Sequence, residues 1–330
     1  MKILLSELPG GPSTLVLREV PEPTPGPGQV RIAVRACGIN YPDVLLIEDK
    51  YQVRLPRPFA PGLEVAGVVD AVGPAAGRFA VGDRVIGHLA SGGLAEKAVT
   101  LAKDCVPIGA EMPFDVAAGL LITYGTSYHA LKDRGELRAG ETLLVLGAAG
   151  GVGLAAVELG KATGARVVAA VSSEAKAQVA RDHGADLAIV YPREPSDPKA
   201  LAGLFKQACG ANGADVIYDP VGGDYAEAAL RAIAWGGRFL VVGFPAGIPR
   251  IPLNLPLLKS CDIRGVIWGA FVARHPTRNA ENLREIVALF ERGAIHPLVS
   301  ERFPLERGGE AIERLSSRAA TGKVVVMIGG

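Results

Sequence analysis

The sequence predicts an α/β protein in which a small β-rich domain is combined with a doubly wound parallel sheet. Glycine and proline residues punctuate residues 1–121 densely, whereas residues 122–267 alternate apolar, strand-like segments with helical ones. A glycine-rich turn lies at the first strand–helix junction of the second region. Alternation at this spacing builds right-handed crossovers and a parallel sheet. Short strands with frequent turns indicate a compact, barrel-like domain.

The bulk composition bounds the class of protein. The chain has 330 residues, which at about 100–200 residues per domain indicates two domains. Hydrophobic residues make up 49% and charged residues 21%, a balance typical of a folded core rather than of disorder. The net charge of +1 argues against a nucleic acid or a membrane surface as partner, since either needs a clustered basic excess.

The cysteines and the hydropathy of the sequence indicate the cellular compartment in which we expect the protein. The cysteines are single and scattered, and no C-x-x-C pair suggests a disulfide framework or a zinc cluster. The apolar run at the N-terminus is too short for a secretory signal, and no stretch of about 18–20 apolar residues predicts a membrane span. We therefore expect a cytoplasmic protein that acts on a small molecule. The four cysteines are Cys37, Cys105, Cys209 and Cys261.

In the first domain, Val30–Arg35 alternates apolar and charged residues as a half-buried strand does. Glu64–Val72 and Arg84–Gly87 are expected to be further short strands, with turn glycines between them.

The second domain begins with Thr142–Leu146, a continuous apolar run typical of a strand buried on both faces. The expected strands after it are Arg166–Val171, Leu187–Val190, Ala214–Asp219, Arg238–Gly243 and Ile263–Ile267. The expected helices between them are Leu154–Thr163, Glu174–His183, Pro198–Cys209 and Tyr225–Ala234. Helices Asn279–Arg292 and Glu306–Ser316 and a strand Val324–Ile328 follow. We assign residues 122–267 to the parallel-sheet domain, and residues 1–121 with 268–330 to the catalytic domain.

The glycine turn Gly147–Gly153 is the strongest local signal. It has the sequence G-A-A-G-G-V-G and separates the first strand of the sheet from the helix that begins near Val152. Glycines allow a tight turn and a close approach to a pyrophosphate, and the helix N-terminus directs free N–H groups at the anion. The alternative is an ordinary tight turn. Because strand, turn, helix and second strand follow in the required order, we predict a Rossmann site for a dinucleotide. The expected contacts are Ala149, Gly150, Gly151 and Val152.

The end of the second strand predicts NADP rather than NAD. An NAD site places Asp or Glu there to bind the ribose 2′-hydroxyl. Here the tip carries Ser172 and Ser173, with Glu174 at the start of the next helix. The two serines can donate to a 2′-phosphate, and Lys176 can pair with its charge. The alternative is that Ser173 only caps a helix and Lys176 is solvated.

Three motifs make the chain resemble the medium-chain dehydrogenase/reductase superfamily, in particular its zinc-free, zeta-crystallin-like quinone oxidoreductase branch. They are G-I-N-Y-P-D at residues 38–43, P-G-L-E-V-A-G-V-V at 61–69, and the glycine turn. The resemblance implies a GroES-like fold for the catalytic domain and NADPH-dependent reduction of quinones or α,β-unsaturated carbonyls.

The same resemblance bears on zinc. In the zinc enzymes of the superfamily, a cysteine ligand matches Asn40 and a histidine ligand matches Leu63, before the glutamate that matches Glu64. Asparagine is a poor zinc ligand and leucine is none. We therefore expect no metal. Without a Lewis acid, hydride delivery to an electron-poor acceptor is easier than alcohol oxidation, and hydrogen-bond donors can stabilise the resulting oxyanion.

The resemblance also implies catalytic residues. The loop of Asn40, Tyr41 and Asp43 is expected at the nicotinamide end, with Asn40 bonding the substrate oxygen and Tyr41 stacking or donating its hydroxyl. Asp43 is expected to organise the loop, or to be a simple turn acid. Tyr51 lines the substrate mouth or packs in the core.

The resemblance implies further cofactor contacts at Thr123 and Tyr191, and the fold implies the others. Thr123 approaches the nicotinamide, or is a buried hydroxyl satisfied within a helix. Tyr191 is placed against the adenosine phosphate, with Arg193 adding charge, and Asp219–Gly222 lies near the ribose. Gly243, Phe244 and Trp268 pass along the carboxamide, although Phe244 and Trp268 are equally explained as core or interface aromatics.

The expected enzyme is an NADPH-dependent reductase of quinones or enones. The resemblance also implies a homodimer through the sheet edge. One alternative is an enoyl-thioester (acyl-CoA) reductase. Another is a protein that binds NADPH without catalysis, as a sensor or a structural component.

Overall fold

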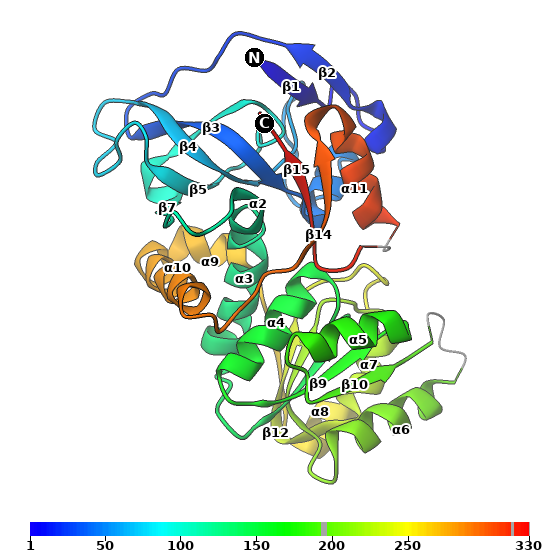
Figure 1. Ribbon diagram of the computed structural model, residues 1–330. Coiled ribbons are helices and arrows are strands. Elements are labelled where there is room, and N and C mark those ends of the chain that lie inside the picture. The colour runs from blue at the N-terminus through cyan, green and yellow to red at the C-terminus, as the bar shows by residue number, and fades with distance from the viewer. Residues whose placement is uncertain (193–196, 318–319, 330) are drawn as a thin grey trace. The chain divides into compact units, whose positions relative to one another are not determined.

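The computed structural model describes residues 1–192, 197–317 and 320–329, so Arg193 lies outside the described residues. The chain forms two compact units, Met1–Ile122 with Pro297–Gly330, and Thr123–His296. In Figure 1 the first unit is blue, cyan and red because it contains both chain ends, and the second is green to orange.

The first unit is built on a seven-stranded sheet with the order β14-β15-β3-β4-β5-β7, in which β6 also pairs with β3. A separate antiparallel pair joins β1 to β2. Its strands are β1 (Lys2–Leu5), β2 (Val16–Glu19), β3 (Gln29–Gly38), β4 (Glu64–Val72), β5 (Arg84–His88), β6 (Lys97–Leu101), β7 (Cys105–Pro107), β14 (Val299–Pro304) and β15 (Lys323–Met327). Its helices are α1 (Tyr41–Ile47), α2 (Phe114–Ala117) and α11 (Gly308–Ser316).

Strand β3 is the centre of this unit. It runs longer than the expected Val30–Arg35 because its inward residues, Val30, Ile32 and Val34, alternate into the apolar core until the chain reaches Gly38. A β-carbon on Gly38 would lie 2.0 Å from the carbonyl oxygen of Ala118, so only glycine fits there.

The second unit is the predicted doubly wound sheet. Six parallel strands lie in the order β10-β9-β8-β11-β12-β13. Successive strands are added on one side of β8 up to β10 and then on its other side from β11, so the strand order reverses between β8 and β11. The strands are β8 (Thr142–Leu146), β9 (Arg166–Val171), β10 (Leu187–Val190), β11 (Ala214–Asp219), β12 (Ile233–Val241) and β13 (Asp262–Gly265). The helices are α3 (Leu121–Tyr128, which begins at the end of the first unit), α4 (Gly151–Ala162), α5 (Glu174–Asp182), α6 (Pro198–Cys209), α7 (Asp224–Leu230), α8 (Asn254–Lys259), α9 (Trp268–Arg274) and α10 (Pro276–Glu291).

Several boundaries differ from the sequence-based expectation. Helix α7 stops at Leu230 rather than Ala234, because β12 already begins at Ile233 and passes through a left-handed residue at Gly236. The tail of the predicted sixth strand is instead the approach to α9, whose first residue is Trp268.

The expected domain boundary after residue 267 also differs from the structure. Helices α9 and α10 belong to the compact unit that contains the parallel sheet. The ring of Trp268 covers Gly125 so closely that a β-carbon there would lie 2.8 Å from it, and its Nε1 donates to Asn279 at 3.0 Å. Asn282 in turn donates to Asp133 at 2.9 Å. These buried contacts tie both helices to α3 and to the π-helix that follows it, η3 (His129–Arg134).

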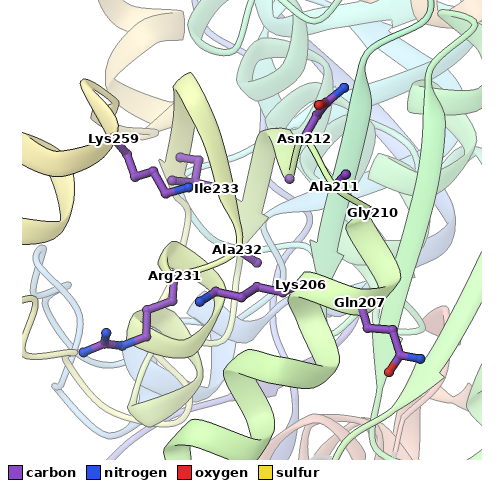
Figure 2. A pocket seen from close by; sticks show the side chains of 10 residues that line it. Lys206, Gln207, Gly210, Ala211, Asn212, Arg231, Ala232, Ile233 and Lys259 are labelled. Carbon is purple, nitrogen blue, oxygen red and sulfur yellow. The ribbon is translucent and has the colours of Figure 1, made fainter.

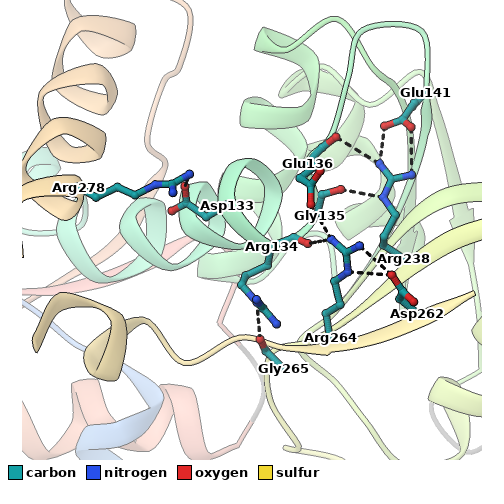
Figure 3. Close-up of polar contacts among 10 residues, drawn as sticks. All are labelled: Asp133, Arg134, Gly135, Glu136, Glu141, Arg238, Asp262, Arg264, Gly265 and Arg278. Carbon is teal, nitrogen blue, oxygen red and sulfur yellow. Dashed lines mark hydrogen bonds and ion pairs between the residues drawn. The ribbon is translucent and has the colours of Figure 1, made fainter. Parts of the chain in front are cut away.

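Two arginines hold the β12–β13 edge of the sheet to the segment after η3 (Figure 3). Arg238 pairs with Glu141 at 2.7 Å and donates to the carbonyl of Gly135 at 2.8 Å. Arg264 donates to the carbonyl of Arg134 at 2.6 Å. Because each guanidinium donates to several acceptors at once, this edge is held in one register.

Candidate active site

The glycine turn has the geometry that a dinucleotide site needs. Gly147 follows β8 with φ of +57°, which favours glycine, and Gly150 is the N-cap of α4. A β-carbon on Gly153 would lie 2.2 Å from the carbonyl oxygen of Gly147, so the third glycine lets the helix approach the turn. No side chain of the described residues caps α4, and the amides of its first turn therefore remain available to an anion.

The tip of β9 lies at the same sheet edge, since β8 and β9 are parallel neighbours. Ser173 is the N-cap of α5 and accepts from the amide of Lys176 at 3.4 Å, as the helix-cap alternative states. Glu174 forms an ion pair with Arg181 on its own helix, with the carboxylate in solvent. Glu174, the acid that follows this tip in the sequence, is thus paired with an arginine of its own helix. Ser172 and Lys176 are half-buried beside the tip.

Tyr191 supports the turn from inside. It is buried, its ring lies 4.8 Å from that of Tyr225, and its amide donates to Val171 at 2.8 Å. Burial raises the pKa of its hydroxyl, while a hydrogen bond from the Gly147 backbone opposes that shift. Tyr191 therefore contacts the glycine turn from the core side.

The ends of β11 and β12 meet beside the turn. Asp219 is buried, and its Oδ1 accepts from the amides of Val221 and Gly222, each at 2.9 Å. Burial raises the pKa of this carboxyl to about 6, and the two amide bonds oppose the shift. The amides of Val242 and Gly243 donate to the Asp219 carbonyl, which joins the two strand ends at this edge.

Of three candidate cofactor contacts, one side chain is exposed to solvent and two are buried. Phe244 is 43% exposed just after β12, whereas Trp268 is 6% and Thr123 3% exposed. The indole of Trp268 packs on α3, as expected of a core aromatic, and Thr123 is a buried residue of that same helix.

Asn40, one of the candidate catalytic residues, lies in a buried polar cluster with Glu64 and Lys323. Asn40 donates from Nδ2 to Glu64 Oε1 at 2.9 Å and to the carbonyl of Gly38 at 3.2 Å. Its Oδ1 accepts from Lys323 Nζ at 2.8 Å. The ammonium also donates to Glu64 Oε1 at 2.7 Å and to the Ile39 carbonyl at 3.0 Å. The three donors of Lys323 and both amide donors of Asn40 therefore have partners within this unit.

Asp43 lies at the start of α1 and accepts hydrogen bonds from two backbone amides, which suits both of its expected roles. Its Oδ2 accepts from the Asn40 amide and its Oδ1 from the Gly62 amide, each at 2.8 Å, which completes a capping box at the start of α1. Burial raises its pKa to about 6. Tyr41 is the first residue of α1 and is 36% exposed, while Tyr51 is partly buried against the apolar core.

A hollow lies in the parallel-sheet unit, away from the glycine turn (Figure 2). It is lined by Lys206, Arg231 and Lys259, and by Gly213 and Ile233 at the amino ends of β11 and β12. The glycine turn follows the carboxyl end of β8, so the hollow is at the opposite edge of the sheet. It plays no part in the predicted cofactor site.

Comparison with known proteins identifies the family. Residues 26–110 match the alcohol dehydrogenase GroES-like domain, and residues 151–288 match the zinc-binding dehydrogenase domain. A quinone oxidoreductase-like protein 2 homolog of Nematostella vectensis is 39% identical over 305 residues, 91% of this chain and 82% of its own length. This chain belongs to the quinone oxidoreductase family of the medium-chain dehydrogenase/reductase superfamily.

Solved structures agree with this assignment. A mycobacterial protein complexed with NADPH is 30% identical with a TM-score of 0.91, over 99% of each chain. The quinone oxidoreductase of Escherichia coli complexed with NADPH is 27% identical with a TM-score of 0.89, over 99% of this chain and 100% of its own.

One matched family model is named for zinc binding, so the fit of the ligand positions to zinc matters. Asn40 and Leu63 stand where the resemblance places two ligands, and the ammonium of Lys323 already lies against both Asn40 and Glu64. Within residues 1–192, 197–317 and 320–329, no group of three His, Cys, Asp or Glu side chains is placed to hold a metal. A buried ammonium and a divalent cation would repel each other, so these residues do not fit zinc.

Sequence reasoning missed two buried charges. Lys323 is the first residue of strand β15 and precedes four apolar residues. This position is a weak sequence signal that the lysine is buried. Glu158 lies in the apolar stretch of α4 and is 4% exposed.

No helix among the described residues is long and apolar enough to cross a membrane.

Proposed function

We propose that this member of the quinone oxidoreductase family is an NADPH-dependent reductase of quinones or α,β-unsaturated carbonyls that works without zinc. The observation that carries the proposal is the glycine turn. Its uncapped helix N-terminus offers amides to a diphosphate, and the neighbouring strand tip presents serines and Lys176 instead of an acid. The NADPH complexes of related structures support the choice of cofactor.

In the proposed reaction, NADPH supplies a hydride when it is bound. The acceptor gains two electrons and one proton at carbon or oxygen, and a second proton reaches the resulting oxyanion, so a quinone becomes a hydroquinone. The chain provides hydrogen bonds to that oxyanion. Because the amide donors of Asn40 already have partners, the hydroxyl of Tyr41 is the better-placed donor of the loop.

We also propose a homodimer through the β13 edge. Strand β13 pairs on one side with β12 and ends the sheet, which leaves a row of strand N–H and C=O groups for a second copy. Exposed apolar side chains gather in this part of the chain: Leu253, Leu257, Leu258, Ile263 and Ile267. Light scattering should give twice the chain mass, and the paired change Leu257→Glu with Ile263→Lys should give a monomer. A monomeric wild type would contradict this proposal.

Oxidation of NADPH at 340 nm separates the candidate functions. We expect turnover with 1,4-benzoquinone or 2-cyclohexenone that survives dialysis against EDTA. A much higher kcat/KM with crotonyl-CoA would indicate an enoyl-thioester reductase instead. Tight NADPH binding without turnover on any of these acceptors would indicate a non-catalytic binding protein. Stoichiometric zinc, with activity lost on its removal, would contradict the zinc-free mechanism.

A further inference from the structure

A single buried carboxylate lies next to both places where the chain passes between its two units. Glu158 is in the middle of α4, the helix that begins at the glycine turn. Its Oε2 accepts from the hydroxyl of Tyr124 at 2.6 Å and from the amide of His296 at 3.0 Å. The units meet along the chain at Ile122–Thr123 and at His296–Pro297. One oxygen atom therefore holds a residue next to each crossing.

The remaining contact of Glu158 involves neither crossing. His183, the C-cap of α5, places Nδ1 within hydrogen-bond distance of Oε1. Burial beside Glu158 raises the pKa of Tyr124 well above its usual value, so its hydroxyl stays a donor throughout the neutral range. A carboxylate in the apolar part of a helix is costly unless it is hydrogen-bonded. Here two of its bonds go to the connecting segments and one to His183.

The first unit holds the same two segments on its own side. Glu64 Oε2 accepts from the amide of Ile122 at 2.9 Å, at the N-terminus of α3. The amide of Lys323 donates to the carbonyl of Leu298 at 2.8 Å. Glu64 and Lys323 are themselves an ion pair at 2.7 Å. Within two residues of each crossing, a residue on either side is thus hydrogen-bonded to Glu158, Glu64 or Lys323 of its own unit.

We propose that Glu158 is a positioning residue for hydride transfer, which acts by holding both connecting segments against the helix that carries the glycine turn. The inference rests on the proposed function, since hydride transfer needs the helix that carries the cofactor turn, and the segments bonded to it, held in one geometry. Glu158 touches neither cofactor nor substrate in this account. Its loss should therefore change the rate of the bound complex more than cofactor affinity.

The test compares Glu158→Ala with Glu158→Gln, because the glutamine oxygen can still accept from Tyr124 and His296. The matched control is Lys161→Ala, which removes an exposed ion pair with Asp186 from the same helix. Three quantities are measured: the Kd of NADPH, kcat with 1,4-benzoquinone, and hydrogen exchange of the peptide that contains the His296 amide.

We expect Glu158→Ala to lower kcat about 10-fold or more, because small misplacements in reacting geometry are costly. The Kd of NADPH should stay within about twofold, the His296 peptide should exchange faster, and Glu158→Gln should restore all three. Tyr124→Phe removes one bond only and should lower kcat about threefold, which keeps the test valid should Glu158→Ala fail to fold.

Three results would overturn the inference: a kcat no lower than that of Lys161→Ala, a Kd that rises in parallel with the fall in kcat, or unchanged exchange at His296. If wild type oxidises no NADPH, the proposed function fails, while the exchange experiment still decides whether Glu158 anchors the segment.

Discussion

Gly153 approaches Gly147 so closely that one added methyl group would lie 2.2 Å from the Gly147 carbonyl oxygen. The two residues belong to opposite ends of the turn, one at the end of β8 and one in the first turn of α4. Their contact sets how near the helix N-terminus comes to the strand, and hence where its free amides lie.

Gly153→Ala is therefore expected to displace α4 and weaken NADPH binding about 10-fold or more, because the amides no longer converge on the diphosphate. The matched control is Gly203→Ala on α6, where a β-carbon meets nothing within 4 Å. The control should raise stability by about 0.5–1 kcal/mol and leave binding unchanged. Fluorescence titration and urea unfolding measure both effects, and normal NADPH affinity in Gly153→Ala would contradict the geometry.

Lys323→Met is expected to destabilise the protein by about 3–5 kcal/mol. It leaves the carboxylate of Glu64 buried without a counter-charge, and the Oδ1 of Asn40 without its donor. Lys97→Met is the comparison, since Lys97 pairs with Asp70 on the same sheet but nearer to solvent, and it should cost about 1 kcal/mol or less. Equal losses of unfolding free energy in the two variants would mean that the buried Lys323–Glu64 pair stabilises the protein no more than the Lys97–Asp70 pair does.

Tyr41→Phe should lower kcat/KM with benzoquinone about 10-fold, the usual effect of removing one hydrogen bond to a developing charge. The melting temperature should not change, because Tyr41 is 36% exposed at the start of α1. Tyr51→Phe is the natural control, and wild-type kinetics in Tyr41→Phe with a loss in Tyr51→Phe would reassign the donor to Tyr51.

Asp219 predicts a specific pH dependence of stability. Its folded pKa of about 6 lies above the ordinary 3.8, so between these values the native state holds a proton that the unfolded state has lost. Stability from this group is therefore highest at low pH and falls as pH rises from about 4 to about 6, by up to about 3 kcal/mol.

Asp219→Asn keeps an oxygen for the Val221 and Gly222 amides but cannot ionise. It should be more stable than wild type at pH 7.5 and equal to it at pH 4, as measured by urea unfolding at both values. A constant difference across this range would contradict the assignment.

Much of the parallel sheet could be predicted from the sequence, because a strand buried on both faces is a continuous apolar run. Thr142–Leu146, Arg166–Val171 and Ala214–Asp219 are confirmed with the expected bounds. The place of α10 could not be predicted, since an amphipathic helix shows which face is apolar but not which domain covers it. The burial of Trp268 against Gly125 decides that question only in the folded chain.

The candidate site was predictable to a different extent in each unit. The glycine turn is local, so spacing alone predicts it. The partners of Asn40 are not local: Glu64 and Lys323 lie 24 and 283 residues away along the chain. Hydrophobic periodicity does not predict such long-range pairs. For the same reason, the apolar sequence of α4 does not predict that Glu158 accepts hydrogen bonds from Tyr124 and His296.

The most direct test of the central claim, that the turn at residues 147–153 binds NADPH, is a fluorescence titration of the wild-type protein with NADPH and with NADH. We expect saturable binding of both, with a Kd for NADPH at least about 10-fold lower, since Ser172 and Lys176 favour the 2′-phosphate. Equal or reversed affinities would contradict the role of the β9 tip, and no binding of either would contradict the cofactor site itself.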